Sequence, residues 1–150
     1  MNLIPSTGYM PFYVSSGKTV ATPSVDASTA LKNSDVYGVI NLISSDVASC
    51  IMQTRNAGAY SSAITLSPNP SISAYSFWQS AITQLLLTGN AYLLIHEDKN
   101  GVWFEQVPTY QVEIQVEDDG SAIQYQLNFS GDRPAVTAKS SEIIHFRLLA

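Results

Sequence analysis

The chain has 150 residues, of which 45 % are hydrophobic and 13 % charged, a balance typical of a folded domain and opposite to that of disordered chains. Its net charge of −5 arises after His96, where nine acidic residues outnumber four basic ones; before that point three acids and three bases cancel. Tight binding of nucleic acid needs clustered Lys and Arg, so the composition argues against a chain that grips DNA through its phosphates. It is compatible with an acidic wall past which DNA slides without being held.

Cysteine usage and hydropathy predict a soluble protein made in a reducing compartment. Cys50 is the only cysteine, so no internal disulfide can form. Residues 1–10 lack the basic run and apolar stretch of a signal peptide. The apolar stretches elsewhere are too short to span a bilayer, so we expect no membrane association.

The chain is expected to divide into an arm and one domain. Residues 1–33 are rich in Ser, Thr, Pro and Gly without a sustained period, which predicts an irregular N-terminal arm. Within the arm, the apolar cluster at 9–14 is expected to pack on its own domain, with packing on a neighbouring subunit as the alternative. Residues 34–150 are predicted to form the folded domain.

A first amphipathic helix is predicted over residues 35–49. Ser34 is expected to be its N-cap, with Asp35 in the first turn. Apolar side chains then recur at helical spacing, namely Val36, Val39, Ile40, Ile43 and Val47. Cys50–Arg55 follows as a predicted short strand.

A second amphipathic helix is predicted over residues 73–88, after the rigid turn Pro68-Asn69-Pro70. Ser71 or Ser73 can cap it. Gly89 stands where a left-handed residue would end the helix. We expect both helices and the next strand to share one core, formed by Val36, Ile40, Ile43, Trp78, Ile82, Leu85 and Leu93.

After Gly89 the apolar period changes from helical to alternating, which predicts antiparallel strands. The strands are expected at 91–97, 102–107, 112–117, 122–129 and 142–147, with turns at Asp98-Lys99-Asn100-Gly101 and Asp118-Asp119-Gly120. The predicted fold class is therefore α+β, with two amphipathic helices packed on a mainly antiparallel sheet.

For each residue that could take part in catalysis or metal binding, a structural role is the better explanation. His96 and His145 lack neighbouring ligands at metal-binding spacing, so both are expected to be hydrogen-bonded side chains. Cys50 is expected to be a packed thiol and not a nucleophile. Asp118 and Asp119 are expected to be solvated turn residues. We therefore predict no catalytic residues, no metal site, no cofactor and no enzymatic activity.

Trp78 could anchor a partner, because tryptophan is enriched at binding hot spots. Its helical spacing with Ile82 and Leu85 favours a place in the core.

Several motifs, taken in order, carry a family resemblance from about residue 30 to 147. The most specific is Leu86-Leu87-Thr88-Gly89-Asn90-Ala91-Tyr92, followed by Pro68-Asn69-Pro70 ahead of Phe77-Trp78, and by Ile143-Ile144-His145. In this order they resemble the N-terminal half of portal proteins from long-tailed double-stranded DNA phages. The positions that match the family pattern, all with an implied structural role, are Pro68, Asn69, Pro70, Trp78, Gly89, Asn90, Tyr92, Pro108 and His145.

The resemblance implies a structural subunit of a twelve-fold ring, the head-tail connector, at one capsid vertex. Such a ring would associate with itself, with the terminase, with the major capsid protein and with tail adaptor proteins. Genomic double-stranded DNA would pass through it during packaging and ejection without being tightly bound. The implied location is the portal vertex of the virion, and the host cytoplasm during assembly.

The resemblance also predicts how much of a portal protein this sequence covers. Family members continue past the strand at 142–147 into stem, clip and crown, whereas this sequence stops at Ala150. We therefore expect a fragment or a shortened form that covers much of the portal wing.

Two alternatives from other classes stay open at this point. The chain could be a stand-alone binding module that holds a peptide or glycan on its β-rich half. It could also be an enzyme whose site the residue inventory does not reveal, which would require a concave pocket with convergent polar groups.

Overall fold

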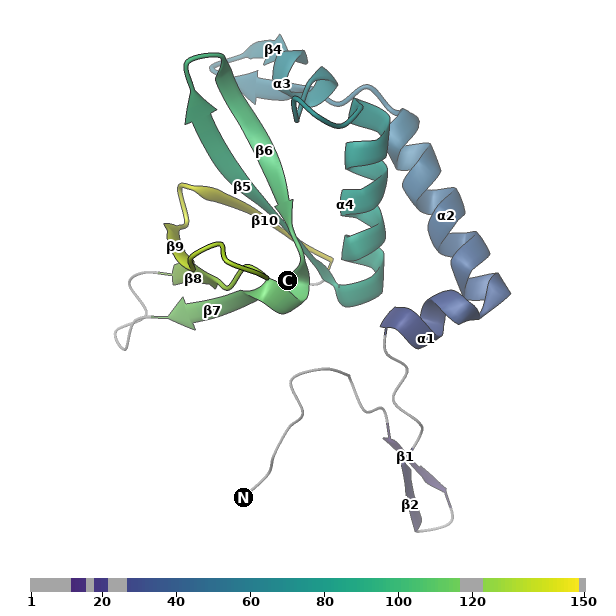
Figure 1. Ribbon diagram of the computed structural model, residues 1–150. Coiled ribbons are helices and arrows are strands. Elements are labelled where there is room, and N and C mark those ends of the chain that lie inside the picture. Colours follow the sequence, from purple (N-terminus) through teal and green to yellow (C-terminus); the bar gives the residue numbers. More distant parts are fainter. Residues whose placement is uncertain (1–11, 16–17, 22–26, 117–122, 149–150) are drawn as a thin grey trace. The chain divides into compact units, whose positions relative to one another are not determined.

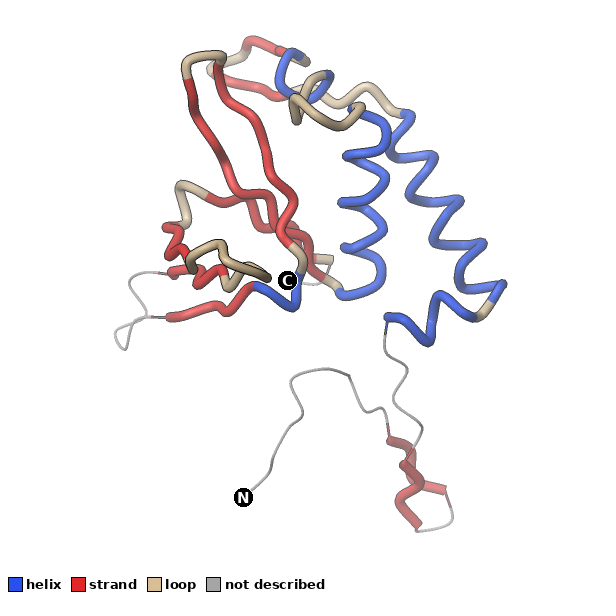
Figure 2. The backbone as a smooth tube through the Cα atoms, in the orientation of Figure 1, coloured by secondary structure: helices blue, strands red, loops and turns tan. Residues whose placement is uncertain are grey.

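The computed structural model describes residues 12–15, 18–21, 27–116 and 123–148. The chain forms two compact units, Met1–Val39 and Ile40–Ala150. Helices and antiparallel strands follow one another along the chain, so the predicted α+β class is confirmed (Figure 2). The predicted turn residues Asp118 and Asp119 lie outside the described residues.

The first unit contains regular elements in the segment expected to be irregular. Strands β1 (Phe12–Ser15) and β2 (Lys18–Ala21) pair as an antiparallel hairpin, and α1 (Ala27–Lys32) precedes α2 (Ser34–Ser49). The expected N-cap of α2 was wrong by one residue. The side chain of Asn33, not Ser34, accepts hydrogen bonds from the backbone N–H groups of Asp35 and Val36, at 3.0 and 3.3 Å. Asparagine serves as well as serine at this position, because its amide oxygen reaches the same backbone donors.

The second unit holds the remaining elements, which match the predicted order. After α2 come β3 (Thr54–Asn56), β4 (Ala59–Ser61), α3 (Ala63–Leu66), α4 (Ala74–Thr88), β5 (Asn90–Asp98), β6 (Gly101–Val107), the 3₁₀ turn η1 (Thr109–Gln111), β7 (Val112–Val116), β8 (Ile123–Leu127), β9 (Val136–Lys139) and β10 (Ile143–Arg147). The strand expected at Cys50–Arg55 lies later, as β3, and β9 was not predicted. The predicted helices at 35–49 and 73–88 are confirmed as α2 and α4.

Two three-stranded sheets, and not one, organise the β-rich half. Their strand orders are β10-β5-β6 and β7-β8-β9, with every pair antiparallel. Strand β5 has buried side chains on both faces. Leu93 lies among the buried residues of α4, whereas Tyr92 and Leu94 pack with buried residues of β8, β9 and β10. The second unit is therefore layered as helices, sheet and second sheet (Figure 1).

The expectation of one shared core was therefore wrong, because the sheet with β5 separates two clusters. The helix-side cluster contains Ala48, Phe77, Trp78, Ala81, Leu93 and Phe104. The cluster between the sheets contains Tyr92, Leu94, Val107, Tyr125, Leu127, Ala138 and Ile143. A strand covered on both faces must carry apolar residues at consecutive positions, as Ala91–Leu94 does.

The predicted apolar stripe of α2 is also corrected. Its buried residues are the small Ser44 and Ala48, whereas Val36 and Ile43 remain 38 % and 41 % exposed. Ala48 lies in the helix-side cluster with residues of α4, and the Ser44 hydroxyl donates to the carbonyl oxygen of Asn41 at 3.2 Å. The amide of Gln79 on α4 then donates to the side chains of Ser45 and Asn41, at 3.0 and 3.3 Å. These hydrogen bonds connect α4 to a polar face of α2 that the apolar pattern did not identify.

Candidate functional site

Motif residues from opposite ends of the domain meet where β5 pairs with β10. The antiparallel register places His145 directly across from Tyr92, and the two rings stack with centroids 4.4 Å apart. The Nε2 of His145 lies 2.8 Å from Oδ1 of Asn90, and its Nδ1 lies 3.3 Å from the hydroxyl of Tyr125. Asn90, Tyr92 and His145 thus form one polar cluster in the otherwise apolar space between the sheets.

The hydrogen bonds of this cluster fit a neutral imidazole. Asn90 donates from Nδ2 to the carbonyl oxygen of Thr88, so its Oδ1 is left to accept from Nε2–H of His145. Nδ1 of His145 then accepts from the Tyr125 hydroxyl. Burial lowers the pKa of His145, and the positive charge of Arg147 lowers it further. Burial also raises the pKa of Tyr92, with Tyr125 adding to the effect. Both groups are therefore held uncharged.

Gly89 joins helix α4 to this cluster. Its φ of 76° is left-handed, and its N–H donates to the carbonyl oxygen of Leu85 at 2.8 Å, so the predicted helix end is confirmed. The carbonyl oxygen of Gly89 accepts from Leu148 N–H at 2.9 Å, just past β10. The chain can therefore turn from helix into β5 within one residue while β10 is fixed beside it.

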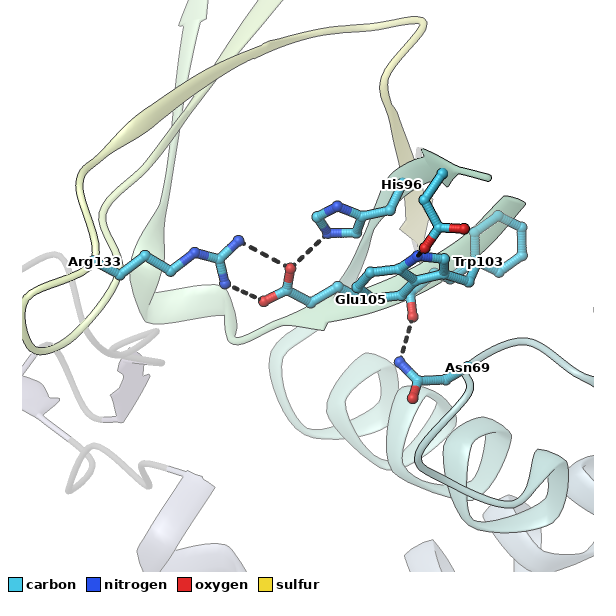
Figure 3. Close-up of polar contacts among 7 residues, drawn as sticks. Asn69, His96, Trp103, Glu105 and Arg133 are labelled. Atoms are coloured by element: carbon cyan, nitrogen blue, oxygen red, sulfur yellow. Dashed lines mark hydrogen bonds and ion pairs between the residues drawn. The ribbon is translucent and has the colours of Figure 1, made fainter. Parts of the chain in front are cut away.

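The Gly89 junction is the first joint between the helix layer and the sheet. A second joint lies at the other end of the helix layer, where the Pro68-Asn69-Pro70 turn contacts the edge of β6. The N–H of Phe104 donates to the carbonyl oxygen of Pro68 at 2.7 Å. In return, Nδ2 of Asn69 donates to the carbonyl oxygen of Phe104 at 2.8 Å (Figure 3). Oδ1 of Asn69 accepts from Ser71 N–H at 2.9 Å, which fixes the amide orientation. Both backbone groups of Phe104 are therefore satisfied at the sheet edge.

Trp78 and Pro108 occupy further joints. Trp78 is buried, and its Nε1–H donates to the carbonyl oxygen of Thr65 at 2.8 Å, which ties α4 to α3. The carbonyl oxygen of Pro108 accepts from Gln111 N–H at 2.9 Å, which closes the 3₁₀ turn leading into β7. Pro70 is exposed and completes the turn that holds Asn69.

Sequence reasoning missed an ion-pair cluster on the surface of the same sheet. Arg133, from the loop before β9, binds both carboxylate oxygens of Glu105 on β6, with Nη2 3.0 Å from Oε2. His96 on β5 lies 2.7 Å from the same carboxylate and stacks on Trp103, with ring centroids 4.1 Å apart. Figure 3 shows these side chains around Glu105. The hydrogen bonds that Glu105 accepts, first from Arg133 and then from His96, lower the pKa of its carboxyl group against the opposing effect of burial.

Part of this cluster could have been predicted. A hairpin turn over Asp98-Lys99-Asn100-Gly101 pairs Asp98 with Gly101, and this pairing sets His96 across from Trp103. The arrival of Arg133 from an irregular loop, with its guanidinium carbon 3.5 Å above the Phe129 ring centroid, depends on the tertiary fold.

Nothing in these clusters is arranged as a catalytic or metal-binding centre. Among the residues that the structure describes, no group of three or more His, Cys, Asp and Glu side chains could hold a metal ion. The expected packing of Cys50 was wrong. Its thiol is exposed at the end of α2, where it donates to the carbonyl oxygen of Asp46 at 3.3 Å.

The family model described as phage portal protein matches residues 34–150, which includes both joints and both sheets. The chain belongs to the phage portal protein family. No curated protein matches the sequence. Portal proteins form a structural family, and a structural role in a portal or neck is the function that this membership supports.

Chains of two solved structures share the fold of this chain. One is described as the neck of an empty GTA particle computed with C6 symmetry, with a TM-score of 0.67 and 16 % identity. The other is the virion of a native gene transfer agent (GTA) particle, with a TM-score of 0.63 and 17 % identity. Each alignment covers 81 % of this chain but only 36 % and 35 % of the solved chains. The chain thus spans about a third of the length of these solved chains.

Proposed function

We propose that this chain is a wing segment of a portal ring, the head-tail connector through which a phage-type genome is packaged and ejected. The observation that carries the proposal is the family match along the complete α+β region, residues 34–150. The fold shared with chains of a GTA neck and virion adds support. The stand-alone binding module has no comparable support.

The motif residues serve this role as joints of a rigid scaffold. Asn90, Tyr92 and His145 connect two strands and the end of a helix, and Asn69 seals the edge of β6. Buried polar groups that are fully hydrogen-bonded fix one packing arrangement, which a subunit in a symmetric ring needs. No residue is assigned to catalysis, and energy for DNA movement is proposed to come from a separate terminase.

The proposed partners follow from the ring. Copies of the protein would associate in a twelve-fold assembly that contacts the terminase, the major capsid protein and tail adaptors. The location would be the portal vertex of the particle, reached from the host cytoplasm during assembly. No helix among the described residues is long and apolar enough to cross a bilayer.

Electron microscopy of the full gene product that contains this chain tests the proposal. Rings with a central hole are the expected result, together with empty procapsids when the gene is disrupted. Monomers or open fibres at micromolar concentration, or normal genome packaging without the gene, would overturn it.

A further inference from the structure

The loop that joins β8 to β9, residues 128–135, reaches from its own sheet to the neighbouring one. Arg133, near the far end of this loop, binds the carboxylate of Glu105 on β6 (Figure 3). Along the chain, the two sheets are connected by η1 and by the turn between β9 and β10. The loop adds a non-covalent link between the sheets, and we call residues 128–135 the strap.

The base of the strap, residues 128–130, is anchored by a buried side chain. Gln111 of η1 is only 9 % exposed, and its backbone carbonyl oxygen accepts from Asn128 N–H at 2.7 Å. Its side-chain amide donates to the hydroxyl of Ser130 at 2.9 Å. Phe129, between these two residues, is half-buried and packs against the cluster between the sheets. The base is therefore tied to the folded core.

Beyond the base, the strap has few contacts. Residues 130–135 are all exposed. Of the described residues 131–135, only Arg133 makes a hydrogen bond, an ion pair or a ring contact. Gly131 has a left-handed φ of 80°, which turns the chain between Phe129 and Arg133. The closed position of this part of the strap therefore depends on one side chain.

The carboxylate that receives Arg133 is held in place without the strap. His96 lies 2.7 Å from Oε2 of Glu105, and its ring stacks on Trp103. Trp103 in turn donates from Nε1 to Oδ2 of Asp98 at 3.2 Å. All four residues belong to the β5–β6 hairpin, whose strand pairing fixes their register. Glu105 therefore keeps its position when Arg133 leaves and can bind it again.

The contact between the strap and β6 is open to water on both sides. The side chains of Arg133 and Glu105 are 42 % and 25 % exposed. Ion pairs with this much solvent access contribute little free energy, and added salt weakens them further. The guanidinium also covers the Phe129 ring, with its carbon 3.5 Å from the ring centroid. Release of Arg133 therefore exposes one face of Phe129.

We infer that residues 131–135 of the strap open and close as a unit while the base and both sheets stay folded, with the Glu105 carboxylate as the site that binds the closed form. Opening breaks the bidentate contact and lifts Arg133 from Phe129. Its free energy is small compared with that of unfolding the sheets, because so few contacts hold these residues. The inference does not depend on the proposed ring.

Limited proteolysis and hydrogen exchange of the full gene product distinguish the open part from the base. An endoproteinase that cleaves before aspartate reports on the Gly131–Asp132 bond, and the amide of Asn128 reports on the base. Cleavage follows the population of the open form when closing is fast. Glu105→Gln should raise the cleavage rate at Asp132 by about three- to tenfold, because a partly exposed bidentate ion pair is lost. Exchange at Asn128 and the melting temperature should stay unchanged.

Two further variants separate this contact from a general effect of charge. Glu142→Gln is the matched control, since it removes the same charge at the far end of β9, where the carboxylate accepts from Lys139 N–H at 2.8 Å. It should leave cleavage at Asp132 unchanged. Arg133→Gln should act like Glu105→Gln, and the double variant should add little, because both substitutions remove one contact.

Salt tests the same contact without any substitution. Raising the salt concentration should speed cleavage at Asp132 in the unsubstituted protein but not in Glu105→Gln, after correction with a free peptide of residues 128–137. Cleavage that responds to neither salt nor Glu105→Gln would overturn the inference. So would a rise that is matched by faster exchange at Asn128 and a lower melting temperature, because the sheets would then open together with the strap. Additive effects in the double variant would also contradict it.

Discussion

At the scale of single residues, the environment of His145 links its protonation to the stability of the fold. The ring is stacked on Tyr92 and hydrogen-bonded at both nitrogens, so protonation would remove the acceptor that the Tyr125 hydroxyl uses. Because burial lowers the pKa of His145 below 6.5, the unfolded chain takes up a proton at higher pH than the folded one.

We therefore expect stability to fall as the pH drops below about 6.5, and to level off once the pH is below the lowered pKa of His145. His145→Gln should remove this fall, and Arg147→Gln, which removes the second cause of the lowered pKa, should reduce it. Urea unfolding at a series of pH values measures the effect. The Glu105 ion pair is lost in a separate pH range, below pH 4.5, because the pKa of Glu105 is lowered from that value. A pH dependence unchanged by His145→Gln would contradict the assignment.

Gly89 provides a test of backbone conformation alone. A Cβ at Gly89 would meet no atom within 4 Å, so Gly89→Ala should cost about 1 kcal/mol through its φ of 76° and not through a clash. Gly38 is the matched control. It lies within α2, also has open space around it, and has no left-handed φ, so Gly38→Ala should stabilise by roughly 0.5–1 kcal/mol. Opposite signs in thermal unfolding are expected, and equal effects would count against the helix end at Gly89.

At the scale of elements, the two helices differ in how they are held. α4 buries Phe77, Trp78 and Ala81 against the sheet, whereas α2 contacts its neighbour through Ser44, Ala48 and polar side chains. The apolar residues of α2 therefore add little to the stability of the isolated domain.

A pair of truncations measures this difference. Leu93→Ala, at a fully buried position of β5, should cost about 2–5 kcal/mol of unfolding free energy. Ile43→Ala should cost less than about 1 kcal/mol, because 41 % of its side chain surface is already exposed. Chemical denaturation of the monomer checks both values. A large loss with Ile43→Ala would show that α2 is buried by a packing partner within the chain.

At the scale of the whole molecule, the net charge determines whether the chain can bind DNA tightly. The net charge is −5, and Arg133, one of seven basic residues, is already bound by Glu105. A channel component should let DNA pass without binding it tightly, and this balance suits that requirement.

Fluorescence anisotropy with duplex DNA tests this property. We expect no sub-micromolar binding at physiological salt, because too few free basic side chains are available to displace counterions. Tight binding that weakens steeply as salt rises would reveal a basic surface and would contradict the charge argument. The controls are DNA with a known basic protein and the same titration of this chain at low salt.

The sequence by itself determined the local structure, because the interactions that end a helix or close a hairpin lie within a few residues. Gly89 ends α4, and Ser73, one of the two serines expected as its cap, accepts a hydrogen bond from Ser76 N–H. The turn over Asp98-Lys99-Asn100-Gly101 sets the β5–β6 register. The ordered motifs also indicated the family, because they mark the positions of its turns and helix ends along the chain.

Only the tertiary structure decided which faces those elements bury. The hydrophobic pattern predicted that α2 would bury Val36 and Ile43, but the residues that α2 buries are Ser44 and Ala48. Likewise, the division into two sheets placed Asn90, Tyr92 and His145 together, and brought Arg133 to Glu105 from 28 residues away. The free energy of these contacts depends on steric fit between distant segments, which periodicity along the chain does not encode.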